Sequence, residues 1–490
     1  MFASAEVTWI GWLVLLPLAA ATASFLARHH GAKIGLANAV LNAVAVVALT
    51  TQVAETGPVS HQIAGWGAPL GIELRADGLA CLMLALTATV GIAVSVYATG
   101  YFLSDTSQRQ YFWPLWLFLW SGLNALFLAA DVFNIYVSLE LLGLSAVALA
   151  ALPGTAASLN AAMRYLLVSL LGSLIYLLGV ALLYTAYHSL DLAALSSAVA
   201  PGPLVWSAMS LMTVGLLMKT ALVPLHFWLP AAHANAPAPV SALLSALVVK
   251  ASFYLLLRLW FELFAGVLSG AALQWLGALG AAALLWGSVL ACYQKRLKLL
   301  VAYSTVAQLG YLFIAFPLVA AAGATGYGAA VYFALSHGFA KAAMFLSAGT
   351  LLHAAGHDRI DELDEIASRM PISMLAFGLA GISLMGLPPS GGFIAKWMLL
   401  EAAMGSGQWW WAVVILLGGL LAGVYVFRVA SLAFATKTVQ PAVPTLRRLE
   451  WSALVLAAIS CLMGLAANLP LSLLSQVSTH SELIVGGGMQ

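Results

Sequence analysis

The feature that most constrains this chain is a succession of long apolar runs separated by short polar connections. Runs of roughly 18 to 25 mostly apolar residues are long enough to cross a bilayer as α-helices. Only 7% of the residues are charged, whereas soluble domains have about a quarter, so a water-facing surface cannot be built from this sequence. We predict an all-α polytopic membrane protein that forms a single membrane domain over 1–490. About fourteen runs lie near 8–26, 34–53, 77–99, 112–130, 132–152, 163–187, 204–225, 238–262, 272–292, 298–320, 324–354, 371–404, 409–435 and 451–477.

Basic residues predict how these helices are oriented. Connections after even-numbered runs hold little besides Arg75 and Arg258. Because basic loops stay on the cytoplasmic side, we predict a multi-pass protein of the cell's inner (plasma) membrane with both termini outside. The first nine residues lack the basic region of a signal peptide, so we expect the first run to be a retained span. Connections after odd-numbered runs hold Arg28, Lys33, Arg109, Arg164, Lys295, Arg296, Lys298, Arg359, Arg369, Lys437, Arg447 and Arg448.

Signals for redox, nucleotide or nucleic-acid chemistry are missing from the sequence. Cys81, Cys292 and Cys461 are scattered in apolar surroundings, which predicts neither disulfides nor a cysteine-rich metal site. The chain has no phosphate-binding loop and no dinucleotide-binding fingerprint. We therefore expect no metal and no cofactor in this chain, no covalent catalysis and no nucleic-acid partner.

Five ionisable residues lie inside the apolar runs, namely Glu140, Lys219, Lys250, Lys341 and Lys396. A charge at the centre of a bilayer costs at least ~3 kcal/mol on insertion scales, and such residues usually mark ion pathways. The alternative is that they form ion pairs that hold helices together. A lysine whose carboxylate partner comes and goes can bind and release a proton, which is what a proton pump or antiporter requires.

Depth along the helices suggests which of these groups can meet. Glu140 follows Asp131 by nine residues, which places it roughly 13 Å into its span at the helical rise per residue. Lys219 lies past the middle of the seventh run, at a comparable depth, so Glu140 and Lys219 can pair. Lys250 is about twelve residues into the eighth run and equally deep.

Histidines beside these lysines are candidate proton relays, because imidazole titrates near neutral pH. His337 and Lys341 are four residues apart and therefore share a helix face. His226 and His233 flank Pro230 just after the seventh run. For each histidine the alternative is a ring held by a backbone carbonyl, which is the better reading of His233. His353 and His357 are expected in a wet loop at the inner end of the eleventh run.

Two apolar runs are interrupted by proline or glycine next to a lysine. The seventh contains KTALVPLHFWLP and the twelfth contains GLPPSGGFIAKW. Such breaks at corresponding positions of two halves are typical of transporter sites, because unwound backbone in a membrane must face protein or water. The broken run is the fourth of five in both 112–262 and 272–435. We predict that these segments are two inverted five-helix repeats with broken helices 7 and 12.

Five motifs, in order, resemble one known family. They are LNALFLAADVFNIYVSLELL, MKTALVPLHFWLPAAHANAPAPVSALLSALVVK, LVAYSTVAQLGY, LSHGFAKAAMFLSAG and GLPPSGGFIAKW. Together they are similar to the proton-conducting antiporter-like family over roughly 75–435. That family includes membrane-arm subunits of respiratory complex I, the A-type and D-type subunits of Mrp cation/proton antiporters, and membrane subunits of energy-converting hydrogenases.

The resemblance implies a fourteen-helix fold with a polar axis along the membrane midplane. It implies that Glu140 pairs with Lys219, that Lys250 is the central lysine and that Lys396 is the terminal group. Two positions depart from the family pattern. Ala231 replaces the usual acid of an LPDAH motif, and Arg296 begins the segment that usually reads DLKR. Both departures concern the inner half of the proton path. The residues that match the relay groups are His226, His337 and Lys341.

The lysine on the twelfth helix resembles that of the D-type Mrp subunit or of the N-type subunit of complex I. We therefore expect a proton-translocating subunit most similar to the D-type subunit of an Mrp Na⁺/H⁺ antiporter. The alternative is a subunit of an NADH-quinone oxidoreductase-like complex or of an energy-converting hydrogenase, in which case it belongs to a translocase enzyme. Two alternatives belong to other functional classes: a structural membrane scaffold, and a membrane enzyme that binds haem or a metal. Expected partners are other membrane subunits, lipid, protons and, for an antiporter, Na⁺.

Overall fold

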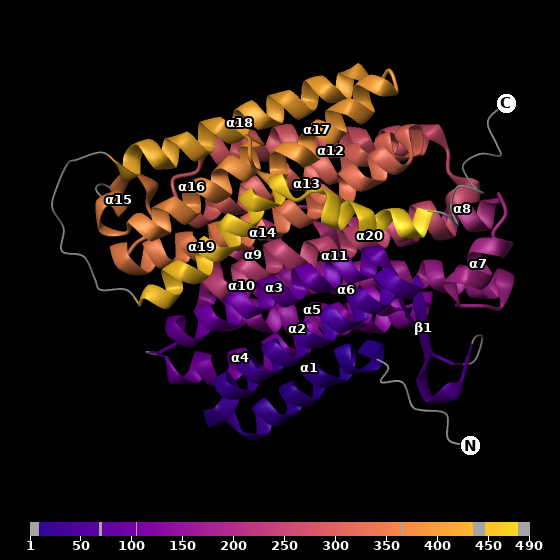
Figure 1. Ribbon diagram of the computed structural model, residues 1–490, viewed down its shortest axis with the longest axis horizontal. Helices are drawn as coiled ribbons and strands as arrows, with labels where there is room; N and C mark the ends of the chain where they lie inside the picture. Colours follow the sequence, from indigo (N-terminus) through magenta and orange to yellow (C-terminus); the bar gives the residue numbers. More distant parts are fainter. Residues whose placement is uncertain (1–8, 68–70, 104, 364–365, 435–445, 479–490) are drawn as a thin grey trace.

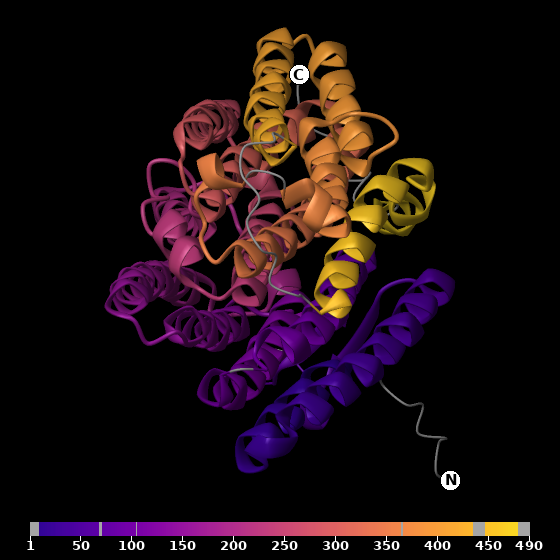
Figure 2. The same ribbon diagram turned by 90° about the vertical axis from the view of Figure 1, so that its left-hand side faces the viewer.

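A computed structural model describes residues 9–67, 71–103, 105–363, 366–434 and 446–478. Its helices run along one common direction (Figure 1) and pack as a bundle when viewed end-on (Figure 2). Among the described residues, twelve continuous helices are long and apolar enough to cross a membrane. Their α-helical parts are α1 (Trp9–Leu26), α2 (Gly31–Thr56), α3 (Gly78–Tyr101), α4 (Thr106–Leu128), α5 (Val132–Ala151), α6 (Ala156–Tyr187), α10 (Ala238–Leu243) with α11 (Val249–Arg258), α12 (Gly270–Tyr293), α13 (Leu297–Ala322), α14 (Ala324–Ala355), α18 (Trp409–Ala433) and α19 (Arg447–Leu462).

The seventh helix is interrupted where the sequence predicts. Its first half, α8 (Pro203–Thr220), ends because Ala221 adopts a left-handed conformation with φ of 58°. Pro224 follows and has no N–H group with which to continue the helix. The second half, α9 (Leu229–Asn235), begins after an irregular stretch of eight residues.

The twelfth helix is interrupted in the same way. Its first half, α16 (Pro371–Met385), ends at Gly386, whose φ of 82° suits a residue without a side chain. Pro388 and Pro389 follow, and α17 (Gly391–Gly405) forms the second half. With the twelve continuous helices, the two interrupted ones confirm the predicted fourteen spans and both predicted breaks. The division into inverted repeats over 112–262 and 272–435 stays a prediction.

Burial separates the helices into a central and a peripheral set. The spans Ala238–Leu263 and Ala324–Ala355 are completely buried in their most apolar windows, whereas α18 is only 39% buried. Because lipid is as apolar as leucine, an exposed apolar face in this bundle is suited to a bilayer. The polar residues of α11 and α14 are thereby kept away from lipid.

Glycines bring the first interrupted helix close to its neighbour. A Cβ atom added at Gly215 of α8 would lie 2.4 Å from the backbone oxygen of Gly172 in α6. A Cβ at Gly172 would lie 2.8 Å from the oxygen of Gly215 and 3.5 Å from Cγ of Lys219. Small residues permit such close contact between membrane helices. The two glycines therefore set the position of α8 and of its lysine.

One end of the bundle carries the connections predicted to be outside, and we call it the outer end. A hairpin of β1 (Val59–Gln62) and β2 (Glu73–Ala76) pairs with Val59 opposite Ala76. The hairpin and the short helix α7 (Leu192–Ala198) both lie at the right of Figure 1. A backbone hydrogen bond from Ala130 to Glu73 ties β2 to the connection between α4 and α5.

The opposite, inner end holds the basic connections. The connection before α13 bonds to the one after α14 through the backbone pairs Leu297–Asp358 and Ile360–Lys295. Nearby, Arg428 donates to the terminal carbonyl oxygens of α12, that of Cys292 at 2.6 Å among them. The short helix α15 (Ile366–Arg369) lies at this end, at the left of Figure 1. Lys437, one of the basic residues that predict the orientation, lies outside the described residues.

The last predicted span is shorter than expected. The sequence predicts one span over 451–477, but α19 ends at Leu462 and a separate helix, α20 (Asn468–Ser478), follows. A 3-10 turn over Met463–Leu465 continues α19, and within it a Cβ at Gly464 would lie 1.9 Å from the oxygen of Pro389. The chain thus contacts the break of the twelfth helix where α19 stops.

Candidate functional site: a buried series of lysines and histidines

Lys219 and Glu140 face one another across α8 and α5 without forming a direct ion pair. Nζ of Lys219, which is in the last turn of α8, donates to Oγ of Ser169 in α6 at 3.0 Å. The charge of Glu140 acts on this ammonium, but Oε1 of Glu140 is buried and has no hydrogen-bond partner. The direct pair predicted from depth is thus replaced by the Lys219–Ser169 bond, because the hydroxyl lies within reach.

His226 lies in the irregular stretch between α8 and α9. It is half-buried, and its Nδ1 atom is buried without a hydrogen-bond partner. In the described part of the chain, no hydrogen bond or ion pair joins His226 to another predicted site residue. The structure therefore places it in the break, as the sequence predicts, but beside the other groups rather than among them.

Lys250 lies completely buried in the eighth helix, directly after a π-helical turn over Leu244–Val248. Nζ of Lys250 donates to the backbone oxygen of Ser245 in that turn. A π-helical turn interrupts the regular i to i−4 bonding of an α-helix, and such turns are frequent at functional sites. Oγ of Ser245 lies 2.9 Å from Oγ1 of Thr305 in α13. The ammonium is therefore held by a neutral oxygen.

His337 and Lys341 share one face of α14, as their spacing predicts. Lys341 is completely buried, and its Nζ donates to the oxygen of Val301 at 2.7 Å and to Oγ of Ser304 at 2.6 Å. His337 is also buried, and neither of its ring nitrogens has a hydrogen-bond partner. The charges of Lys250, Lys341 and Lys396 all act on the His337 ring, and Lys341 lies one helical turn from it.

Lys396 extends from the second half of the twelfth helix to the end of the first half. Its Nζ donates to the oxygens of Leu384 at 2.7 Å and of Met385 at 3.1 Å, the last carbonyls of α16. Carbonyls at a helix end have no partner within the helix and carry partial negative charge, so an ammonium stabilises them. The Leu384 oxygen also accepts from Nε2 of Gln308 at 3.3 Å. Nζ also lies 4.5 Å from the ring centre of Tyr311.

His233 and Lys298 extend the series towards the inner end. The sequence offers His233 as a candidate relay but favours a structural role for it, and it does not single out Lys298. His233 in α9 is completely buried, its ring stacks on Phe345 at 4.7 Å, and neither ring nitrogen has a hydrogen-bond partner. The interpretation of His233 as held by a carbonyl is therefore wrong. The charges of Lys250, Lys298 and Lys341 act on its ring. Its position between three lysines is visible only in three dimensions.

A pocket of about 380 Å³ opens at the inner end beside Lys298. Asn235, Arg296, His353 and His357 are among the residues that line it. His357 lies in the loop after α14, as predicted, but His353 lies in the last turn of that helix. Nζ of Lys298 donates to the oxygen of Ala236. The two departures from the family pattern lie close by. Arg296 is paired with Asp358 at 2.5 Å, and Ala231 is partly buried in α9.

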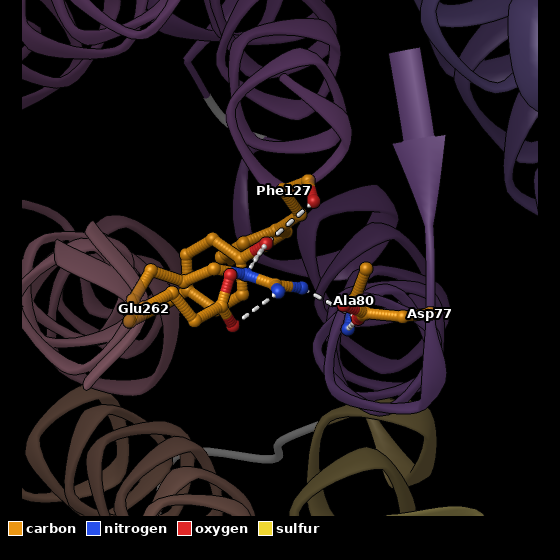
Figure 3. Close-up of polar contacts among 6 residues, drawn as sticks. Asp77, Ala80, Phe127 and Glu262 are labelled. Carbon is orange, nitrogen blue, oxygen red and sulfur yellow. Dashed lines mark hydrogen bonds and ion pairs between the residues drawn. The ribbon is translucent and has the colours of Figure 1, made fainter. Parts of the chain in front are cut away.

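A cluster of charged residues lies at the outer end of the eighth helix (Figure 3). Arg258 donates to Asp77 at 2.5 Å, to Glu262 at 2.6 Å and, through Nε, to the hydroxyl of Tyr254 at 2.9 Å. Tyr254 in turn donates to the oxygen of Phe127 at 2.7 Å. Arg258 is therefore a buried partner of α3, and not a residue of an outer connection as the charge pattern predicts.

The four buried lysines of the predicted path share one kind of environment. In the described part of the chain, Lys219, Lys250, Lys341 and Lys396 all donate to hydroxyl or backbone oxygens, and none forms an ion pair with a carboxylate. When such a lysine loses its proton, no buried carboxylate loses a partner from a direct ion pair. The alternative in which these lysines are ion pairs that hold helices together is therefore not what the geometry shows.

Among the described residues, no group of three histidine, cysteine or carboxylate side chains is placed to hold a metal ion. The arrangement can instead accept and release protons at a series of amines and imidazoles.

Comparison with known proteins identifies the family. The model of the family described as "NADH:quinone oxidoreductase/Mrp antiporter, TM" matches residues 129–422. The chain belongs to this family. A second model, described as "NADH-Ubiquinone oxidoreductase (complex I), chain 5 N-terminus", matches residues 66–112. The resemblance stated from the sequence motifs is thereby confirmed.

Relatives within the family carry two kinds of name. The N-type subunit of the NADH-quinone oxidoreductase of Desulforudis audaxviator is 37% identical over 88% of this chain and 87% of its own length. The D-type subunit of the Na(+)/H(+) antiporter of Bacillus subtilis is 29% identical over 83% of each chain. The solved Mrp complex from Dietzia sp. DQ12-45-1b contains a chain that matches 98% of this one and 100% of itself, with 25% identity and a TM-score of 0.88. The chain is therefore an antiporter-like membrane subunit of this family.

Proposed function

We propose that this chain translocates protons along its buried lysines as one subunit of a multisubunit membrane complex, most like the D-type subunit of an Mrp Na⁺/H⁺ antiporter. One observation carries the proposal. Four membrane-buried lysines are held by neutral oxygens, and two buried histidines, His233 and His337, have no hydrogen-bond partner and are subject to the charges of these lysines. Intramembrane ionisable groups that line up in this way are typical of proton relays.

Access from the inner end is supported by the pocket beside Lys298. The pocket is large enough for several waters, and Lys298 lies in its wall. A proton taken up there passes to His233, because the charges of both Lys298 and Lys250 act on its ring. Water is required between these groups, because no hydrogen bond of the described residues joins them directly.

Lys219 supplies the switch in this proposal. Its ammonium rests on Ser169, while the unpaired Glu140 oxygen attracts it from α5. Movement of the ammonium from the hydroxyl to the carboxylate would favour the charged lysine, and its return would favour loss of the proton. Because Lys219 ends a half-helix, such a movement requires only its side chain.

The proton then moves from Lys250 towards Lys396. The charges of Lys250, Lys341 and Lys396 all act on His337, so we assign it as the relay group common to the second half of the path. Lys396 is the terminal group of this path, and the backbone oxygens at the break of the twelfth helix hold its ammonium until the proton leaves. His226 in the other break is proposed to play the corresponding part in the first half.

A second candidate function rests on the relative with the highest identity given above. That protein is named as a subunit of NADH-quinone oxidoreductase, so the same path in this chain can be driven by a redox partner instead of a Na⁺ gradient. Hydrogenase-like complexes are included in this candidate. The partners would then contain the redox centres. Co-purification separates the two, because Mrp-type membrane partners support the first candidate and iron–sulfur subunits support the second.

The proposed location is the plasma membrane with both termini outside. The basic connections at the inner end and the scarcity of basic residues at the outer end support this orientation. A tag at either terminus that is cleaved by protease added to intact cells would test it.

The decisive test replaces Lys250 with alanine in the assembled complex and measures coupled proton flux in membrane vesicles. The proposal expects flux to be lost while the complex still assembles. Lys33→Ala, at an exposed position on α2, is the matched control and should retain flux. Normal flux with Lys250→Ala would support the structural scaffold instead.

A further inference from the structure

We propose that the eighth helix carries an outer seal, in which an apolar collar is held closed by the Asp77–Arg258–Glu262 ion-pair clamp, so that a proton on Lys250 cannot escape to the outer side. The inference rests on the proposed function, because a seal matters only if Lys250 carries protons. The seal would make proton movement from Lys250 proceed along the path rather than straight to the outer side. The collar consists of Leu79, Met83, Phe253, Leu257, Val331 and Ala334.

Residue spacing places the clamp on the outward continuation of the proton path. Lys250, Tyr254, Arg258 and Glu262 follow one another at intervals of four and therefore lie near one face of the helix. Arg258 is eight residues beyond Lys250, or about 12 Å along the helix axis. This stripe is a polar route that leads from the central lysine towards the outer end.

The hydrogen bonds of this stripe do not form a proton wire. Nζ of Lys250 donates to Ser245, which precedes it in the helix and lies on the inner side. Tyr254 gives its hydroxyl proton to the oxygen of Phe127 and accepts from Arg258. Arginine stays protonated in proteins, so Arg258 cannot pass a proton on. A proton on Lys250 therefore has no hydrogen-bonded route to Tyr254 or beyond along this stripe.

The collar fills this gap with apolar side chains from three helices. Met83 comes from α3, Phe253 from α11 and Ala334 from α14. Ala334 lies three residues outward of His337, as Phe253 lies three residues outward of Lys250. The space among these side chains is about 10 Å³. A water needs at least this volume and two or more polar partners, and the lining offers only Tyr254, so the collar is dry.

The clamp explains how the collar stays closed. Asp77 is fully buried, and its Oδ1 accepts from both Arg258 and the backbone N–H of Ala80 at the start of α3. It therefore fixes α3 to α11 two residues before the collar begins at Leu79. Arg258 bonds to both carboxylates, that of Asp77 at the start of α3 and that of Glu262 in the eighth helix. Figure 3 shows Asp77 and Glu262 on opposite sides of this cluster. Hydrophobic constrictions block conduction by excluding water, and a clamp that prevents widening maintains this barrier.

The first test makes the collar polar without touching the clamp. Met83→Gln, nearly equal in size, supplies hydrogen-bond partners for water, whereas Met83→Leu keeps the collar apolar. In vesicles that contain the whole complex, with an imposed pH gradient and no coupling ion, Met83→Gln should raise passive proton leak several-fold and Met83→Leu should not. Adding Lys250→Ala to Met83→Gln should remove the leak. The proposal would be overturned if the Met83→Gln complex showed no increase in passive proton leak, or if its leak persisted after Lys250 was replaced.

The second test reports on water access directly. With the clamp intact, Met83→Cys should stay unreactive towards a membrane-impermeant maleimide added outside, while Arg75→Cys, exposed on β2, should react. The unsubstituted chain, with its three cysteines, provides the baseline. Adding Asp77→Asn with Arg258→Gln should make Cys at position 83 reactive. If that variant does not assemble, labelling of Met83→Cys with the clamp intact is sufficient to reject the seal.

These results separate the seal from the proposed function. If Met83→Gln stays tight while Lys250→Ala abolishes coupled flux, the seal is wrong and the proton path stands. If Lys250→Ala leaves coupled flux unchanged, the path itself fails, and the seal fails with it.

Discussion

Nζ of Lys219 donates to Oγ of Ser169 at 3.0 Å, which joins the end of one half-helix to the middle of its neighbour. The ammonium lies within the influence of Glu140 but rests on a neutral hydroxyl. A buried ammonium held by a neutral group can change protonation at lower cost than one in a buried ion pair. This contact therefore influences how easily Lys219 gains and loses a proton in the first half of the path.

We expect Ser169→Ala to destabilise the complex and slow transport. The substitution leaves the buried ammonium of Lys219 without its hydroxyl acceptor, at a cost of about 1.5–3 kcal/mol for a bond to a charged group. Thermal unfolding of the purified complex measures the loss. Ser173→Ala is the control, since Oγ of Ser173 lies four residues further on, buried and without a hydrogen-bond partner. Equal effects of the two variants would contradict the assigned contact.

Replacing Lys250 tests whether proton release, rather than charge, is required. Lys250→Arg retains a positive charge but cannot release a proton, and Lys250→Met retains the aliphatic length without any charge. Both should abolish coupled proton flux while partner subunits still co-purify. Substantial flux with Lys250→Arg would show that only the charge matters.

His233 should be required for proton uptake from the inner end. His233→Gln keeps a polar side chain of similar reach but cannot relay protons, so coupled flux should fall several-fold. His353→Gln removes an exposed imidazole from the wall of the same pocket and should have little effect. The ratio of the two fluxes is the measurement. A larger loss with His353→Gln would place the relay in the pocket wall instead.

The close approach of α6 and α8 gives a prediction about stability. Gly215→Ala places a Cβ 2.4 Å from the oxygen of Gly172, so the helices must separate. Overpacking of this kind costs typically about 1–3 kcal/mol, and here it should also displace Lys219 from Ser169. Gly378→Ala in α16 is the matched control, because a Cβ there meets nothing within 4 Å. Alanine in a helix is favoured over glycine, so the control should be neutral or stabilising in the same unfolding assay.

Local properties of the chain were readable from the sequence. The length of each apolar run predicts a span, and Pro224, Pro388 and Pro389 predict breaks, because a missing N–H acts within its own helix. The four-residue spacing of His337 and Lys341 likewise predicts a shared face. Placement of the seven predicted path residues within helices or breaks followed from the same local rules.

Most contacts of the buried charges were decided by the tertiary structure alone, although Lys250 bonds within its own helix to Ser245. Ser169, Val301 and Leu384 hold lysines that are 50, 40 and 12 residues away in the chain, and Asp77 meets Arg258 across 181 residues. The sequence determined that charged groups lie deep in an apolar bundle, since depth depends on position along one helix. Which oxygen satisfies each group depends on how separate helices pack side by side, and that is set by surfaces distributed over the whole chain.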